Sequence, residues 1–187
     1  SVVVLPFNNL PASEALIRKN ADCLAAIIID PLSTAAGLTL PQPEFLLMLR
    51  AVTEELGILL LFDEIVSFRL GSGGTQGAFG IRPDLTCLAK VVAGGTAGGA
   101  FGGKEEVMAL YDPTGGSPAI AQSGTYNGNP ISAVAGLSAL VRRKVTRRGC
   151  AYDEQEFRAR QSQYSRGKGM PHLLAHEHPH APESGVE

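Results

Sequence analysis

Cysteine, charged residues and long apolar runs are all scarce in this sequence. The three cysteines, Cys23, Cys87 and Cys150, are odd in number and far apart. This excludes a disulfide framework and the closely spaced cysteine pairs of a zinc site. A reducing compartment is therefore the expected setting, and we predict a cytoplasmic protein.

The low charge argues against a nucleic-acid-binding protein, and the short apolar runs argue against a membrane-spanning one. Charged residues make up 18% of the 187 residues, and the formal net charge is −2, so we expect no nucleic-acid partner. The longest apolar runs, such as residues 24–29 and 58–62, are too short to span a bilayer. The first residues lack the pattern of a signal peptide, and no initiator Met is present. We expect no membrane association and a start inside a longer protein.

The apolar residues that are present alternate between strand-like runs and a helical period. Residues 2–5 and 24–29 predict buried strands, the second covered on both faces. Phe45, Leu49, Val52 and Leu56 fall on one face of a helix that Gly57 is placed to end. Residues 58–62 predict the next buried strand. A strand, a helix and a strand in this order indicate two parallel strands.

The second half continues this pattern and then loses it. Residues 85–88 and 100–103 predict strands, and 131–141 an apolar helix, whereas the glycine-rich segment 69–80 is expected to be a loop. Beyond Arg142 the apolar periodicity disappears, while Pro, His and Gly accumulate. We therefore predict an ordered domain over 1–141 and a divergent, largely disordered tail over 142–187.

The tail contains two features that resemble binding sites. The four histidines at 172, 176, 178 and 180 could bind a metal, but the prolines among them disfavour a rigid site, so no metal is expected. The basic cluster at 142–148 could contact nucleic acid, but it is more typical of the cationic end of a helix.

Asp63 is the first residue with a chemical interpretation. It follows the buried strand 58–62, on the side where open parallel sheets bind ligands; Asp30 follows the preceding strand on the same side. A carboxylate in this position needs a partner. The partner could be a helix end, a cation such as Arg69, or the cationic ring nitrogen of a cofactor.

Lys90 is the second such residue. Leu88, Val91 and Val92 surround it in sequence. Apolar surroundings withhold water from an ammonium group and favour the neutral amine, which attacks aldehydes. The alternative is a lysine that extends from a strand end into water.

The third element is the loop that precedes the helix 131–141. Backbone N–H groups at Gly124, the Thr125 hydroxyl and the helix start that follows Asn129 together suit a phosphate group. An ordinary N-capped turn is the alternative.

Taken together, these motifs resemble those of the class-III aminotransferases. The resemblance lies in Leu-Leu-Leu-Phe-Asp-Glu-Ile-Val-Ser-Phe-Arg at 59–69 and Gly-Ile-Arg-Pro-Asp-Leu-Thr-Cys-Leu-Ala-Lys at 80–90, and in Gly-Ala-Phe-Gly-Gly at 99–103 and Gly-Thr-Tyr-Asn-Gly-Asn-Pro at 124–130. They occur in the order of the family. Among its members, the aminomutases that act on glutamate 1-semialdehyde share the Phe-Gly-Gly and Gly-Asn-Pro phrases.

The resemblance implies a fold, a cofactor and a role for each residue. The fold would be part of the α/β large domain of fold-type-I pyridoxal-phosphate (PLP) enzymes, a mostly parallel sheet flanked by helices. Lys90 would form a Schiff base with PLP and later move a proton, Asp63 would keep the pyridine nitrogen protonated, and Ile65 would press on the ring. Gly124 and Thr125 would bind the cofactor phosphate of the neighbouring subunit in a homodimer. The substrate would be a small amino acid or semialdehyde.

The sequence also departs from the family pattern. Asp30-Pro31 stands where Glu-Pro is usual, and residues 95–99 replace a glycine-Pro-Val phrase. Glu64 and Arg69 are expected to support the loop rather than to contact substrate. Family members are much longer than this chain. The alternative is therefore a non-catalytic, truncated remnant of such an enzyme.

Overall fold

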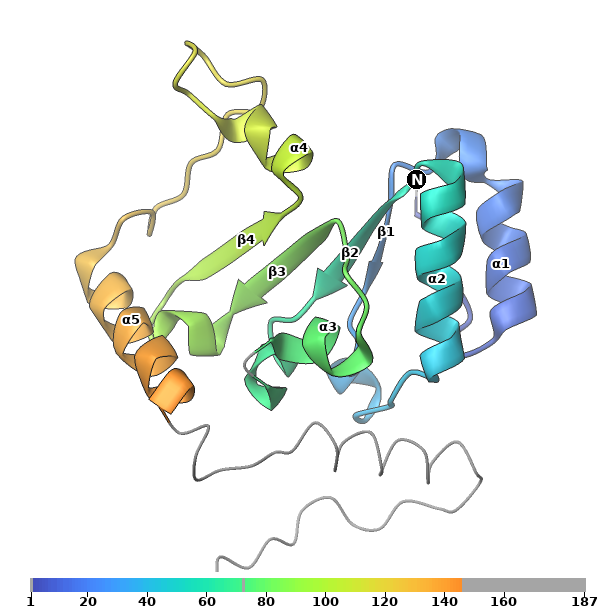
Figure 1. The fold of residues 1–187 in the computed structure, drawn as a ribbon, viewed down its shortest axis with the longest axis horizontal. Helices are drawn as coiled ribbons and strands as arrows, with labels where there is room; N and C mark the ends of the chain where they lie inside the picture. The colour runs from blue at the N-terminus through green and yellow to red at the C-terminus, as the bar shows by residue number, and fades with distance from the viewer. Residues whose placement is uncertain (1, 72, 146–187) are drawn as a thin grey trace, which may run out of the picture.

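A four-stranded sheet forms the centre of the computed structural model, which describes residues 2–71 and 73–145 (Figure 1). The strands β1 (Ala26–Ile29), β2 (Leu59–Asp63), β3 (Leu85–Ala89) and β4 (Gly99–Gly103) lie side by side in chain order. β1, β2 and β3 are parallel, and β4 is antiparallel to β3. This confirms the predicted α/β class with a mostly parallel sheet.

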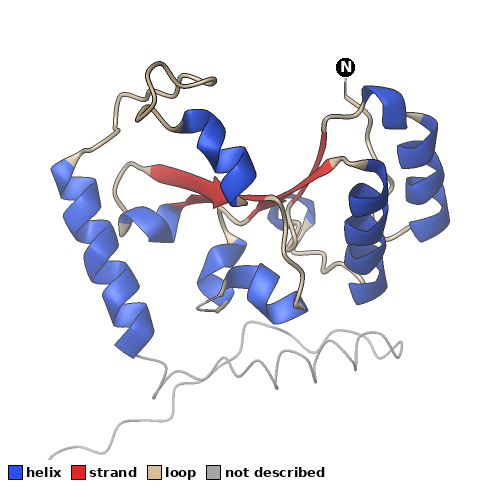
Figure 2. Cartoon of the chain, turned by 45° about the horizontal axis from the view of Figure 1, so that its top comes forward, coloured by secondary structure: helices blue, strands red, loops and turns tan. Residues whose placement is uncertain are grey.

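Two helices cover one face of the sheet at its β1 and β2 side. They are α1 (Leu10–Lys19) and α2 (Pro43–Leu56), which run next to each other in both views (Figures 1 and 2). As the period predicted, Phe45, Leu49 and Val52 are buried, and α2 ends at Gly57, whose φ of 67° is left-handed. These side chains pack with Leu60 and others into one apolar core.

The remaining helices are α3 (Gly74–Phe79), α4 (Glu105–Met108) and α5 (Pro130–Val145). Short 3-10 turns separate the larger elements; they are η1 (Ala21–Cys23), η2 (Thr34–Ala36), η3 (Ser67–Leu70), η4 (Lys90–Ala93) and η5 (Ala109–Tyr111). α5 lies beside η4 at the β4 end of the sheet (Figure 1). The fold thus places the residues around 90 between the sheet and α5.

Two strand predictions were wrong in part. Residues 2–5 form no strand, and Val2 and Val4 are 90% and 83% exposed, because no neighbouring strand offers them a ladder. β1 is covered on one face rather than on both. Ile27 and Ile29 are buried towards α1 and α2, whereas Ile28 is 63% exposed on the opposite face.

The prediction of a loop over 69–80 was also wrong. Residues 67–70 and 74–79 form η3 and α3, although glycine is a poor helix former. The cause is a tertiary contact, because the buried carboxylate of Glu64 accepts the N–H groups of Thr75 and Gln76 at 2.6 and 3.1 Å. These two N–H groups have no partner within the first turn of the helix.

The predicted boundary at 141 stays a prediction. α5 continues to Val145, and residues 146–187, with the four tail histidines and with Arg147 and Arg148 of the basic cluster, lie outside the described residues. Within the described ranges, no group of three His, Cys, Asp or Glu side chains could hold a metal ion. In the same ranges, no helix is both long and apolar enough to cross a bilayer.

Candidate active site

Asp63 lies at the carboxyl end of β2, on the face of the sheet that points away from α1 and α2. Side chains alternate along β2, with Leu60 and Phe62 buried and Leu59, Leu61 and Asp63 half-buried. The Asp63 carboxylate accepts the N–H of Ile65 at 3.0 Å, which orients it at the strand end. Within the described part of the chain Arg69 does not pair with it. The salt-bridge alternative for Asp63 is therefore not found.

Cys87 is the neighbour of Asp63 on β3. The two Cα atoms are partners in the parallel register, so their side chains lie on the same face of the sheet. Burial raises the pKa of the Cys87 thiol, and the negative charge of Asp63 raises it further. The thiol therefore stays protonated at neutral pH. No sequence pattern assigns Cys87 a role, since the strand register that brings it to Asp63 is a tertiary feature.

Lys90 follows the last residue of β3 and opens the turn η4. Its backbone is left-handed, with φ at 52°, and its carbonyl accepts the N–H of Gly95 at 3.3 Å. Its side chain is exposed, so the apolar surroundings expected around it are not present in the described chain. The reason is its position, because it lies one residue past the strand, where the chain turns away from the packed sheet.

Asp63 and Lys90 lie at one edge of the sheet. Since β2 and β3 are parallel neighbours and Asp63 pairs with Cys87, Lys90 is three residues beyond the partner of Asp63 on the adjacent strand. Asp30 follows β1 at the same edge, where its Oδ1 accepts the N–H of Leu32 at 2.9 Å. The carboxyl ends of three parallel strands therefore gather two carboxylates and one amine, where sheets of this kind bind ligands.

Glu64 supports this edge from inside. Its side chain is fully buried, and besides the N–H groups of Thr75 and Gln76 it accepts the Gln76 side-chain amide at 3.2 Å. The same amide donates to the Thr86 hydroxyl on β3 at 3.2 Å. Glu64 thus ties the loop that begins with half-buried Ile65 to α3 and to β3. The supporting role predicted for Glu64 is confirmed by these contacts.

The loop before α5 has the predicted helix start. The Asn129 carboxamide oxygen accepts the N–H groups of Ile131 and Ser132 at 3.0 and 3.1 Å, which caps the helix. Gly124 and Thr125 are exposed, and the Gly124 carbonyl accepts the N–H of Asn127 at 3.0 Å. This loop does not contact Asp63 or Lys90 in any hydrogen bond of the described chain. Its assignment as an anion site stays a prediction.

The groups at this edge suit a pyridoxal cofactor. Such a cofactor needs an amine for its aldehyde and an acid for its ring nitrogen, and Lys90 and Asp63 offer these groups from adjacent strand ends. Lys90 is exposed and so accessible to an aldehyde, and among the described residues the Asp63 carboxylate is engaged by one backbone N–H rather than by a cation.

Comparisons with known proteins point to one family. Residues 8–149 match the family "Aminotransferase class-III". Over 139 residues the chain is 49% identical to a glutamate-1-semialdehyde 2,1-aminomutase from Pyrobaculum aerophilum. The aligned region covers 74% of the chain and 32% of that relative.

Solved structures agree with this match. An omega-transaminase from Sphaerobacter thermophilus superposes with a TM-score of 0.76 and 44% identity, covering 91% of the chain and 39% of that protein. A transaminase with PLP bound superposes with a TM-score of 0.72 and 38% identity, covering 75% and 33%. The chain thus spans about a third of the length of its relatives. The matched family, the shared fold and the motif order together show that this chain belongs to the class-III aminotransferases, a family of PLP-dependent enzymes.

Proposed function

We propose that this chain is the cofactor-binding part of a PLP-dependent amino-group transfer enzyme, with Lys90 as the residue that binds the cofactor covalently. The observation that carries the proposal is the presence of Asp63 and Lys90 at adjacent, parallel strand ends in a member of this family. PLP supplies an aldehyde and an electron-accepting ring that stabilises negative charge on a substrate carbon. The chain would supply the amine that holds it and the carboxylate that keeps its ring nitrogen protonated.

Each site residue has a proposed task. The Lys90 amine would hold the cofactor through its aldehyde carbon, and the same amine, once displaced by a substrate amine, would move a proton at the substrate carbon. The Asp63 carboxylate accepts a hydrogen bond from the protonated ring nitrogen, and the half-buried Ile65 side chain, two residues further, presses on the ring. Gly124 and Thr125 bind the phosphate of a neighbouring subunit. Both residues are exposed, and no hydrogen bond among the described residues joins their loop to Asp63 or Lys90. These observations support a role towards another copy of the chain.

For the reaction, we propose the conversion of glutamate 1-semialdehyde to 5-aminolevulinate, an amino-group shift within one molecule. The 49% identity to an aminomutase supports it. Transfer between two molecules is the alternative, and the 44% identity to an omega-transaminase favours it. Small amino acids or semialdehydes are substrates in both cases. We propose a homodimer as the working form and, from the scarcity of cysteine, the cytoplasm as its location.

A non-catalytic remnant is the second candidate function. It is favoured by the exposure of Lys90 in the described chain. Such a chain would keep the fold without holding the cofactor.

Mixing the chain with PLP separates the two candidates. We expect an absorbance band of a protonated imine and, after borohydride reduction, a pyridoxyl group on Lys90 in the mass spectrum. Both should disappear in Lys90→Ala and persist in Lys19→Ala, which removes another exposed lysine far from the site. An unmodified Lys90 in the parent chain would support the remnant.

A product assay distinguishes the two reactions. Glutamate 1-semialdehyde is supplied to the PLP-loaded chain, and to any longer product of the same gene, and 5-aminolevulinate is measured against transamination of ordinary keto acids. Aminolevulinate without keto-acid dependence supports the aminomutase. A strict need for an amino donor and a keto acid supports the transaminase.

A further inference from the structure

The backbone of Lys90 has a conformation that a lysine does not adopt by itself. Its φ of 52° is left-handed, whereas the preceding Ala89 is extended, with φ at −153°. Residues other than glycine, asparagine and aspartate are rarely found there, because the Cβ of an L-residue crowds the following carbonyl. Such a conformation persists only when the surrounding structure enforces it, and it is often found at functional sites.

Hydrogen bonds inside the turn provide part of this restraint. The N–H groups of Gly94 and Gly95 close the turn onto the carbonyls of Val91 and Lys90, at 3.1 and 3.3 Å. Gly94 is itself left-handed, with φ at 63°. The Thr96 hydroxyl donates to the Ala93 carbonyl at 2.7 Å. A turn at the molecular surface still needs a support from outside.

Helix α5 is that support. Gly94 and Gly136 lie at the contact, and a Cβ on Gly136 would collide with the Val92 carbonyl oxygen, while a Cβ on Gly94 would collide with the backbone of Ala135. The two backbones therefore approach to a distance that only glycine permits on each side. Next to this contact, the Ser132 hydroxyl donates to the Ala97 carbonyl at 2.6 Å and ties α5 to the end of the turn.

We propose that Gly136 and Ser132 are positioning residues for Lys90, holding its backbone left-handed so that its amine is presented at the strand edge beside Asp63. The inference rests on the proposed function, which makes Lys90 the lysine that binds PLP. Both residues act through the turn and do not touch cofactor or substrate. Gly136 is buried against the Val92 carbonyl, although much of α5 around it is exposed.

Selective labelling of Lys90 tests the proposal in the whole 187-residue chain. The chain is mixed with limiting PLP and reduced with borohydride, and the pyridoxyl group on Lys90 is measured relative to that on Lys19 by mass spectrometry. Lys19 is an exposed lysine on α1 and serves as an internal reference. In Gly136→Ala the Lys90-to-Lys19 ratio should fall about tenfold, because Cβ pushes the turn away from α5. An exposed Lys90 that only reacts nonspecifically would not show this loss of selectivity.

Three further variants separate positioning from folding. Gly136→Ala gains helix propensity but forces the Val92 carbonyl aside, so the folded fraction of each variant is measured by urea denaturation. The loss of label on Lys90 should exceed the loss of folded protein. Ser132→Ala should lower the ratio about threefold, and Ser132→Thr, which keeps the hydroxyl, should restore it. Ser138→Ala, on the exposed side of α5, should match the parent chain.

The outcomes distinguish the inference from the function it rests on. If Gly136→Ala and Ser132→Ala both keep the Lys90-to-Lys19 labelling ratio of the parent chain, the positioning role is overturned. The proposed function of Lys90 is then not affected. Loss of label in proportion to loss of folded protein, without rescue by Ser132→Thr, would also overturn it. If the parent chain shows no preference for Lys90 over Lys19, the proposed function fails and the positioning role fails with it.

Discussion

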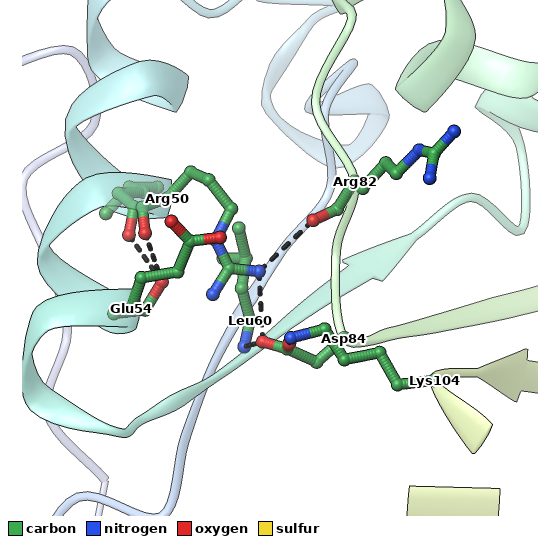
Figure 3. Close-up of polar contacts among 8 residues, drawn as sticks. Arg50, Glu54, Leu60, Arg82, Asp84 and Lys104 are labelled. Atoms are coloured by element: carbon green, nitrogen blue, oxygen red, sulfur yellow. Dashed lines mark hydrogen bonds and ion pairs between the residues drawn. The ribbon is translucent and has the colours of Figure 1, made fainter. Parts of the chain in front are cut away.

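At the scale of single residues, Asp84 is a buried carboxylate with three partners among the described residues. It lies at the start of β3, the end opposite the candidate site, with its side chain 3% exposed. It binds Arg50 at 3.0 Å, Lys104 at 2.7 Å and the N–H of Leu60 at 2.7 Å (Figure 3). One side chain thus connects α2, β2, β3 and the end of β4.

These partners set the ionisation of Asp84. Burial alone would raise its pKa, but the hydrogen bonds from the Leu60 N–H, Lys104 and Arg50 outweigh burial and lower the pKa below its usual value. A carboxyl whose pKa is lower in the folded state stabilises the fold above its unfolded pKa of about 3.9. This contribution is lost as the pH falls through the lower, folded value.

Asp84→Asn should therefore destabilise the chain by about 3 kcal/mol at pH 7, because it removes the buried negative charge that Arg50 and Lys104 share. The free energy of unfolding is measured by urea titration at several pH values. The gap between parent and variant should close in acid, as the parent carboxyl becomes protonated. Asp22→Asn, at an exposed aspartate, is the control and should change little. A gap that is constant down to pH 2 would contradict the proposed ionisation.

At the scale of elements, α3 shows how a buried carboxylate creates a helix from a sequence that does not favour one. Gly74 has a left-handed φ of 64°, and a Cβ there would collide with the Glu64 carboxylate. Gly80 ends the same helix with φ at 67°, and a Cβ there would meet open space. The two glycines therefore share a backbone requirement, but only Gly74 also makes room for Glu64.

Gly74→Ala should be more destabilising than Gly80→Ala. Both pay about 1 kcal/mol for a left-handed alanine, and Gly74→Ala adds about 2 kcal/mol, because its methyl group displaces Glu64. Urea denaturation of the two variants measures the difference. Equal losses would show that the Glu64 carboxylate does not fill this space.

Helices and strands could be predicted from the sequence where the apolar period was long. The prediction failed where tertiary contacts determine which element forms. The spacing of Phe45, Leu49 and Val52 predicts α2, because a helix of this length needs one buried face. Helix α3 has no such period, and its N–H groups are satisfied by Glu64, ten or more residues earlier in the chain. The short apolar run at residues 2–5 predicts a strand, but a strand needs a partner to pair with.

At the scale of the whole molecule, the described chain exposes apolar side chains that a folded protein usually covers. Ile131, Val134 and Leu137 on α5 are 71%, 66% and 65% exposed. Apolar patches of this kind are typical of surfaces that bind another protein. The proposed homodimer gives this face a partner in a second copy of the chain.

We therefore expect the chain to self-associate through α5. Sedimentation should show a larger species as the concentration rises, and Val134→Glu should raise the dissociation constant by about tenfold or more, since a charge on a buried apolar contact is costly. Ala51→Glu, which adds the same charge to an exposed position of α2, should leave association unchanged. Equal weakening by both variants would assign the effect to net charge rather than to α5.

Some features of the candidate site can also be predicted from the local sequence, whereas others depend on tertiary contacts. Asp63 could be placed at a strand end from the sequence, because an apolar run predicts the strand and the acid follows it. The pairing of Asp63 with Cys87 could not, since register depends on how two strands far apart in sequence align. The left-handed backbone of Lys90 and its support by Gly136 also depend on packing between η4 and α5.

The sequence by itself determined the class of fold, the strands β1 to β4 with helix α2, and the family, because these follow from apolar periodicity and from motifs that are local in the chain. Only the tertiary structure decided which face of β1 is covered, that Glu64 builds α3, and that Lys90 is exposed in a left-handed turn. These features arise from contacts between residues distant in sequence, whose energies depend on geometry and burial that no local pattern contains.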